Sequence, residues 1–193
     1  MRQQPTIEQL FDSLIKIKLL KLFLRNPETS FTASEAAKKI GCAAAGAKRH
    51  IFKLREIGFL SQRGSKNKKA KFALNRNFVL YPELENLLSK LIPVPFERLK
   101  KQIKGLGNVR LAIISGVFLN EKASRLDFLL VGEKINQRKL NNFIKKTEQH
   151  IGREIVFVVF NNKEFNYRLD VRDRFVRDIL EGRHEKLLQR IKL

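Results

Sequence analysis

Apolar side chains recur at helical spacing in three stretches of the first 60 residues, and capping or turn residues separate these stretches. Thr32 and Glu35 form the pattern of a capping box, while Gly41 and Gly58 suit the left-handed conformation that ends many helices. A second capping pattern at Thr6 opens the first stretch. Together these signals predict three helices, over residues 7–24, 33–40 and 42–57.

The spacing changes after residue 58, where short apolar stretches rich in strand-forming residues replace the helical period. Two strands are predicted, over residues 59–63 and 70–74, with the polar turn 64–69 between them. A further helix is predicted over residues 83–91.

The segment Pro93-Val94-Pro95 then divides the chain, because each proline removes a backbone donor and disfavours helix before it. We expect one domain over residues 1–92 and a second over 93–193. In the second domain, helices are predicted over 96–104, 137–150, 170–180 and 185–191, and strands over 109–114, 125–131 and 155–160. Strands that alternate with helices of this length indicate a small α/β layer, so the fold class expected for the whole chain is α+β.

The composition adds a large positive charge to this picture. The 193-residue chain has 40 Lys and Arg against 19 Asp and Glu, a formal net charge of +21. This charge points to a polyanionic partner, with nucleic acid ahead of an anionic membrane surface. A basic surface that serves only solubility is the alternative. The 43% of hydrophobic residues, spread along the chain, argue against a disordered basic tail.

Other classes of protein are excluded by what the sequence lacks. The most apolar stretch, residues 7–24, is interrupted by charged residues and is no membrane span or signal segment. Cys42 is the single cysteine, so a disulfide scaffold is excluded, and no His or Cys spacing suits a metal. We therefore expect a cytoplasmic protein with no metal, no cofactor and no membrane contact.

Three helices followed by a two-stranded ribbon are the element order of a winged helix-turn-helix, whose third helix enters the DNA major groove. The segments 32–37 (TASEAA) and 48–60 (KRHIFKLREIGFL) resemble the winged-helix repressors of the ArsR and MarR type. The resemblance covers about residues 7–77. It implies a winged-helix fold and duplex DNA as the partner.

Candidate DNA contacts lie on the third helix and around the predicted turn. If Ile51, Leu54 and Ile57 face the core, the opposite side of the helix presents two small residues and three cations, namely Ala44, Ala45, Lys48, Arg49 and Lys53. No acidic residue lies between Ile57 and Pro82, and the candidate contacts there are Arg63, Lys66, Lys68, Lys69 and Lys71. A solvated lysine turn that protects a sheet edge is the alternative.

The second domain resembles the minimal nucleotidyltransferase domain, on the segments 109–118 (VRLAIISGVF) and 124–132 (SRLDFLLVG). That family needs a Gly-Ser turn for the triphosphate and paired carboxylates for two Mg²⁺ ions. Gly116 and Asp127 match its motif, whereas Val117 replaces the serine and Arg125 replaces the first carboxylate. We expect Arg125 to form an ion pair with Asp127. The resemblance therefore implies a nucleotidyltransferase-like fold with a degenerate motif and no catalytic residues.

These observations predict a DNA-binding transcriptional regulator whose second domain is not an enzyme and serves dimerisation, ligand binding or contact with a partner. A homodimer is one expected state, because DNA-reading helices commonly act as symmetric pairs on palindromic sites. Two alternatives stay open, and both keep RNA as a partner. One is a Mg²⁺-dependent nucleotidyltransferase that acts on protein or RNA, and the other is a basic adaptor associated with RNA or the ribosome.

Overall fold

The computed structural model describes residues 13–64, 70–90, 94–121 and 124–192. Helices and two separate β-sheets make the chain a mixed α+β protein, as the sequence predicted. The chain divides into two compact units: unit 1 comprises Met1–Leu91 with Glu148–Arg153, and unit 2 comprises Ile92–Thr147 with Glu154–Leu193. None of the described helices is long and apolar enough to cross a membrane.

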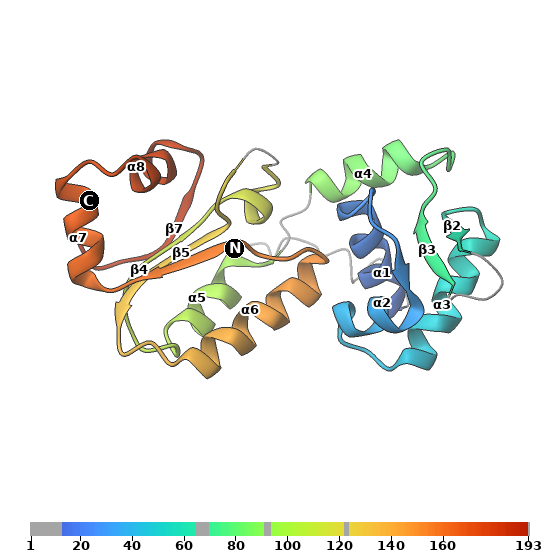
Figure 1. Ribbon diagram of the computed structural model, residues 1–193, viewed down its shortest axis with the longest axis horizontal. Coiled ribbons are helices and arrows are strands. Elements are labelled where there is room, and N and C mark those ends of the chain that lie inside the picture. The colour runs from blue at the N-terminus through green and yellow to red at the C-terminus, as the bar shows by residue number, and fades with distance from the viewer. Residues whose placement is uncertain (1–12, 65–69, 91–93, 122–123, 193) are drawn as a thin grey trace. The chain divides into compact units, whose positions relative to one another are not determined.

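Unit 1 combines helices with a three-stranded antiparallel sheet of strand order β1-β3-β2 (Figure 1). Its elements up to residue 90 are α1 (Leu14–Arg25), β1 (Phe31–Thr32), α2 (Ala33–Ile40), α3 (Ala44–Glu56), β2 (Leu60–Arg63), β3 (Lys71–Leu74) and α4 (Tyr81–Lys90). The predicted helices and strands of this half are confirmed, with shifts of their ends. The predicted start of the first helix at Thr6 lies outside the described residues, and Ser13 caps α1.

Local sequence signals set both ends of α2. The backbone N–H of Glu35 donates to Thr32 Oγ1 (3.2 Å), and the N–H of Thr32 donates to the Glu35 carboxylate (2.7 Å), which completes the predicted capping box. At the other end, Gly41 adopts the left-handed conformation (φ 67°), and Lys18 Nζ of α1 donates to the Ile40 carbonyl (3.0 Å). These contacts fix where the chain turns from α2 towards α3.

Helix α3 is shorter than predicted at both ends. It begins after Ala43, which makes no side-chain cap, rather than at Cys42. It ends before Ile57, whose side chain is 58% exposed, so the expectation that Ile57 faces the core is wrong. The reason is that the chain turns at Gly58 (φ 82°), and the helical period no longer applies there. The buried face of α3 consists of Ala47, Ile51 and Leu54.

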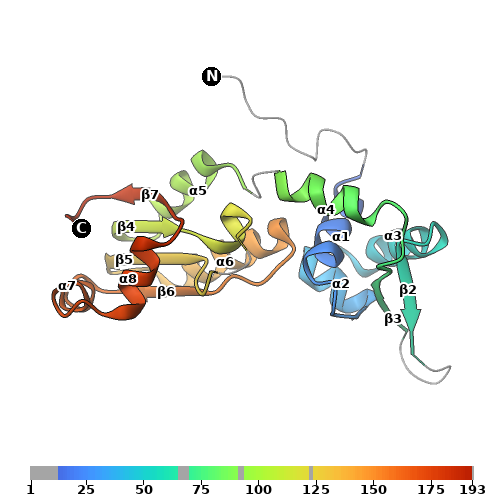
Figure 2. The same cartoon turned by 90° about the horizontal axis from the view of Figure 1, so that it is seen from above.

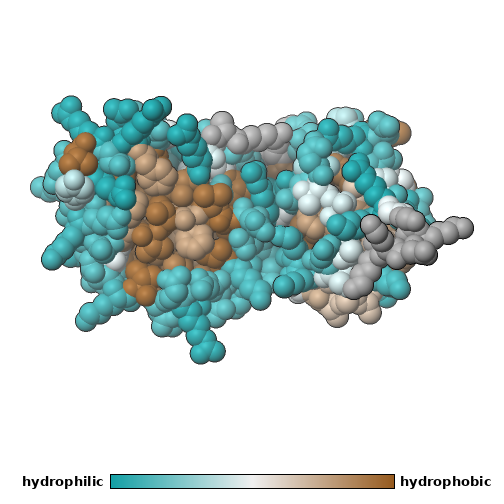
Figure 3. Space-filling model, viewed as in Figure 1, coloured by the Kyte–Doolittle hydropathy of each residue, from teal (hydrophilic) through white to brown (hydrophobic). Residues whose placement is uncertain are grey.

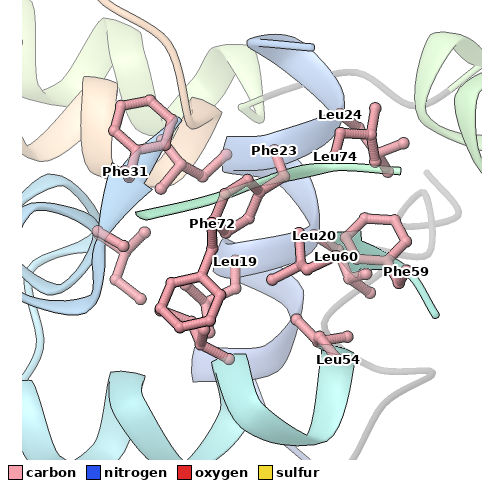
Figure 4. Close-up of a cluster of buried hydrophobic side chains, with 14 of the residues drawn as sticks. Leu19, Leu20, Phe23, Leu24, Phe31, Leu54, Phe59, Leu60, Phe72 and Leu74 are labelled. Carbon is pink, nitrogen blue, oxygen red and sulfur yellow. The ribbon is translucent and has the colours of Figure 1, made fainter. Parts of the chain in front are cut away.

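One hydrophobic core holds the helices of unit 1 against its sheet (Figure 4). Phe23 of α1 lies edge-on to Phe31 of β1, with 5.7 Å between ring centroids, and Phe31 is the cross-strand partner of Phe72 in β3. The two-residue β1 was missed, because so short a strand shows no alternation and is defined only by its pairing. Other side chains in this core are Leu19, Leu20, Leu24, Leu54, Phe59, Leu60 and Leu74.

Unit 2 contains a four-stranded mixed sheet of strand order β6-β5-β4-β7 (Figure 2). The strands are β4 (Asn108–Ile114), β5 (Phe128–Glu133), β6 (Phe157–Phe160) and β7 (Glu185–Gln189), and only β5 and β6 pair in parallel. The helices of this half are α5 (Phe96–Ile103), the 3₁₀ turn η2 (Gly116–Leu119), α6 (Gln137–Ile151), α7 (Asn162–Asp170) and α8 (Arg174–Glu181). The last turn of α6 belongs to unit 1.

Three elements of the second half differ from the sequence predictions. The helix predicted over residues 185–191 is wrong, because residues 185–189 pair with β4 as strand β7 and bury Leu187. Helix α7 was missed, although Asn161 supplies a side-chain cap for it. Helix α8 is capped by Asp173, so it begins later than predicted. The remaining predicted helices and strands are present with shifted ends.

Helices cover both faces of the unit 2 sheet. In β5, Leu129 and Val131 belong to the same buried cluster as Phe165 of α7 and Val176 of α8. Phe128 points to the opposite face, because successive strand residues alternate, and its ring centroid lies 5.6 Å from that of Phe143 in α6. The predicted buried side of α6 is confirmed, with Leu140, Phe143, Ile144 and Thr147 all buried.

Thr32→Ala removes the oxygen that accepts the Glu35 N–H, and we expect it to lower the free energy of unfolding by about 1 kcal/mol. Urea denaturation followed by circular dichroism measures this loss. Ser34→Ala is the matched control, because Ser34 lies in the same helix, is exposed and does not cap it. Equal losses in the two variants would contradict the role of the capping box.

Candidate functional site

The side of α3 that faces away from the core is accessible and basic. Its exposed residues include all the contacts predicted on this helix, namely Ala44, Ala45, Lys48, Arg49 and Lys53. Ala44 and Ala45 form the start of the helix, so the first two helical residues have small side chains. Lys48, Arg49 and the half-buried Phe52 lie three and four positions apart and therefore share one stripe of the helix surface.

Phe52, which is not among the predicted contacts, connects this stripe to the sheet. Lys48 Nζ lies 5.9 Å from the centroid of the Phe52 ring, and the Arg55 guanidinium carbon lies 4.8 Å from it. The same ring meets Phe72 of β3 edge-on, with centroids 5.9 Å apart, and Arg55 Nη1 donates to Gln62 Oε1 of β2 (2.9 Å). The four-residue spacing from Lys48 to Phe52 was the available sequence signal.

Strands β2 and β3, here called the ribbon (residues 60–63 and 71–74), hold two cations side by side. Arg63 and Lys71 are directly opposed in the antiparallel register, so their side chains share a face, and both are exposed. Like charges at opposed positions repel each other. Among the described residues no carboxylate forms an ion pair with either cation. Figure 2 shows the ribbon extending from the region of α3. The predicted contacts Lys66, Lys68 and Lys69 lie outside the described residues.

Arg76 belongs to the same stretch without acidic residues but differs from these cations. Its guanidinium forms an ion pair with Glu28, which comes from the loop before β1. Both side chains are exposed to solvent. The positive charge of Arg76 is therefore compensated within the chain, whereas the charges of Arg63 and Lys71 are not compensated by any described carboxylate.

The pKa of His50 is affected by positive charges near the α3 surface. Its Nε2 lies 3.3 Å from Ser13 Oγ at the start of α1. Partial desolvation, followed by the positive charges of Arg49, Lys53 and Lys16, lowers the pKa of His50 below its ordinary value. Desolvation is the larger cause of this shift, and two cations of the candidate interface, Arg49 and Lys53, add to it.

Unit 2 has a pocket beside the end of β4, with a volume of about 240 Å³. Its wall carries charges of both signs, from Arg125 and Arg183 and from Glu121 and Asp178, with Phe175 as an aromatic member. The two motif residues predicted in this half, Gly116 and Asp127, are not among the pocket-lining residues.

Asp127 is instead a structural carboxylate. It is only 8% exposed, and its oxygens accept hydrogen bonds from the backbone N–H groups of Val117 (Oδ1, 2.7 Å) and Val156 (Oδ2, 2.8 Å). These bonds tie η2 and the residue before β6 to the start of β5. Gly116 adopts φ 50°, and a Cβ at this position would collide with Asp127 Oδ1. Both motif residues therefore serve the packing of this corner of the fold.

The predicted ion pair between Arg125 and Asp127 does not form in the described part of the chain. Arg125 is exposed and lines the pocket, while both Asp127 oxygens face backbone N–H groups. Hydrogen bonds to the backbone thus take the place of the expected cation. Within the described ranges, no three His, Cys, Asp or Glu side chains gather in an arrangement that holds a metal ion.

Comparisons with known protein families, with characterised proteins and with solved structures found no match for this chain. Its function is therefore inferred from the charges, contacts and burial of its own residues, since fold class alone does not define a function.

We expect His50 to titrate below pH 6.5, its ordinary value, and Arg49→Ala to raise its midpoint because one positive neighbour is removed. The unfolded chain then binds this proton at higher pH than the folded chain. His50 should therefore lower the free energy of unfolding as the pH falls from 6.5 through its folded-state pKa. NMR titration of the imidazole resonances measures the midpoint. Lys38→Ala is the control, because Lys38 is exposed on α2 and is not among the groups that lower this pKa. A midpoint above pH 6.5 would contradict the expected effect of desolvation and of the neighbouring positive charges on this pKa.

Asp127→Asn replaces one of the two accepting oxygens by a donor, so it leaves the N–H of Val117 or of Val156 unpaired in a buried site. We expect a loss of about 2 kcal/mol in the free energy of unfolding. Asp178→Asn is the matched control, because Asp178 lines the pocket, is exposed and forms a long ion pair with Arg174. Thermal and urea denaturation measure both variants, and equal stability of the two would contradict the structural role.

Proposed function

We propose that unit 1 is a winged helix-turn-helix that binds duplex DNA, with α3 as the recognition helix and the ribbon as the wing. The observation that carries this proposal is the uncompensated pair Arg63 and Lys71, on a ribbon joined through Phe52 to the basic stripe of α3. A phosphate backbone that contacts the ribbon would relieve this repulsion and release counterions. The order of three helices and a ribbon supports the same class of fold.

Helix α3 has side chains suited to the major groove, which is about 12 Å wide and admits one helix. Ala44 and Ala45 allow the backbone to approach the bases closely, because their side chains are small and exposed. Arg49 has the planar fork that hydrogen-bonds guanine O6 and N7 together. Lys48 and Lys53 are suited to phosphates, so α3 would read sequence while the ribbon fixes position on the backbone.

The charge of the whole chain supports a polyanionic partner. Residues 1–92 hold 18 Lys and Arg and 7 Asp and Glu, and residues 93–193 hold 22 and 12, so the two halves carry +11 and +10. The proposal assigns the sequence-dependent contacts to unit 1. The charge of the second half would add affinity that does not depend on sequence.

We further propose that the protein is a cytoplasmic transcriptional regulator. In it, unit 2 is a nucleotidyltransferase-like domain without catalytic activity, which serves dimerisation, ligand binding or partner contact. The engagement of both Asp127 oxygens by backbone N–H groups supports this role, because two divalent ions need several available carboxylate oxygens. Arg125 adds a positive charge where the family motif has a carboxylate. Mg²⁺-dependent transfer of a labelled nucleotide to protein or RNA would overturn this part of the proposal.

The double variant Arg63→Glu/Lys71→Glu tests the ribbon. We expect its affinity for duplex DNA to fall at least about tenfold at 150 mM salt. The slope of log affinity against log salt concentration should become shallower by about 2, because two phosphate contacts are lost. Fluorescence anisotropy with a duplex chosen from a random library measures both quantities, and the selection itself identifies the sequence that is bound.

The matched control is Lys145→Glu/Lys146→Glu, which makes the same change in net charge at two exposed positions of α6. Equal losses in the two variants would show that only net charge matters and would contradict the assigned interface. The same measurement with duplex RNA and single strands separates the remaining alternative. Tighter binding to RNA than to duplex DNA would favour an RNA-associated adaptor, because a helix cannot enter the deep, narrow major groove of RNA.

A further inference from the structure

Strand β6 forms one edge of the unit 2 sheet, and no strand among the described residues pairs with its outer side. The run from Val156 to Phe160 is entirely apolar. Phe157, Val158 and Val159 are half-buried, and Val156 is 57% exposed. An apolar edge strand with open hydrogen-bonding groups is a surface on which another strand can pair.

The opposite edge of the same sheet is protected against such pairing. Strand β7 exposes Glu185, Lys186 and Gln189, and its register with β4 shifts between Ala112 and Ile113. Charged side chains and local irregularities are devices that prevent pairing between edges. Strand β6 has neither device, because it is apolar and pairs with β5 in unbroken register.

The pairing of β6 with β5 determines which of its backbone groups point outward. The N–H of Phe128 donates to the Val156 carbonyl (3.2 Å), and Phe128 is the register partner of Phe157. In a parallel pair, a residue directs both its N–H and its C=O to the same side, and the sides alternate along the strand. The backbone N–H and C=O groups of Val158 therefore point towards β5, as those of Val156 do. The N–H and C=O groups of Phe157 and Val159 point to the open edge.

Charge and surface composition favour contact at this segment. Residues 154–185 hold 6 Lys and Arg and 7 Asp and Glu, a formal charge of −1 in a chain of +21. Two copies of the chain would repel each other less where they meet through this nearly neutral segment than through a basic one. Figure 3 shows a continuous apolar area on unit 2, in the region of the sheet and α8. The ring of Phe175 in α8, which packs edge-on against Phe160, is partly exposed.

We infer that two copies of this chain form a two-fold symmetric dimer in which their β6 strands pair antiparallel. Opposed residues of an antiparallel pair face the same side of the sheet. One residue must therefore lie opposite its own symmetry mate, and the two-fold axis passes midway between these two residues. With Val158 on the axis, Phe157 opposes Val159 of the partner subunit. These are the residues whose backbone groups point outward, so each such pair forms two interchain hydrogen bonds. This register also covers the whole apolar run 156–160.

A second copy is the occupant that this edge fits, because a two-fold axis makes an identical edge complementary to itself. The opposed side chains are all Val or Phe, which are the types that stabilise cross-strand pairs. This inference goes beyond the proposed DNA binding and does not depend on it. A two-fold pair of chains would, however, carry the two copies of α3 that a palindromic site requires.

The test places a thiol on the two-fold axis of the full-length chain in the absence of DNA. Cys42 is the single cysteine, so Cys42→Ala/Val158→Cys has one thiol in each copy. At a pair without hydrogen bonds the two Cα atoms lie about 4.5 Å apart, which is within the range for a disulfide. We expect mild oxidation to link most of this variant into dimers. Cys42→Ala/Val79→Cys, with its thiol at an 84% exposed position of unit 1, should stay unlinked.

Sedimentation of the unmodified chain and of Val156→Lys supplies a second readout. Because Val156 is exposed in a single copy, the variant should fold normally, which circular dichroism can verify. In the dimer, however, its lysine lies opposite Phe160 of the partner subunit. We expect the dimer dissociation constant to rise at least about tenfold, which is about 1.4 kcal/mol. An unmodified chain that is monomeric at 100 µM would overturn the inference. So would a dimer in which the thiols at position 158 do not link or which Val156→Lys leaves unchanged.

Discussion

The burial of Phe72 in β3 is the constraint on which the candidate interface of unit 1 depends. Its ring is 2% exposed and lies edge-on to Phe52 of α3, while its backbone pairs with Phe31 of β1 on one side and with Gln62 of β2 on the other. Lys71, the residue before Phe72, is exposed and is opposed by the exposed Arg63 of β2. The contacts of this one packed ring thus join the ribbon to the face of α3 whose lysine lies over Phe52.

In unit 2, a buried carboxylate has the corresponding structural importance. Asp127 joins three segments of the chain, because one of its oxygens accepts from the N–H of Val117 and the other from the N–H of Val156. Gly116 must lack a side chain for this arrangement to pack. The presence of both residues is therefore explained by the free energy of folding, and the resemblance to a catalytic motif needs no catalysis to account for it.

The distribution of charge separates two kinds of surface. The cations of α3 and the ribbon are exposed, and Arg63 and Lys71 oppose each other without a described carboxylate between them. In residues 154–185, the segment that contains β6, the charges nearly cancel, and the strand itself is apolar. Electrostatic repulsion thus favours a polyanion at the first surface and permits a like-charged copy of the chain at the second.

Much of the fold followed from local signals. The capping box at Thr32, the left-handed Gly41 and the buried side of α6 were predictable, because each depends on residues within one or two helical turns. The exposure of the cations on α3 followed in the same way from the helical period. The strand at 185–189, the short β1 and the backbone partners of Asp127 did not, since each is set by pairing with segments far away in sequence. Local sequence determined the ends of helices and their buried faces. Only the tertiary structure decided which strands pair, because the residues next to a strand in the sequence do not specify the strand with which it forms hydrogen bonds.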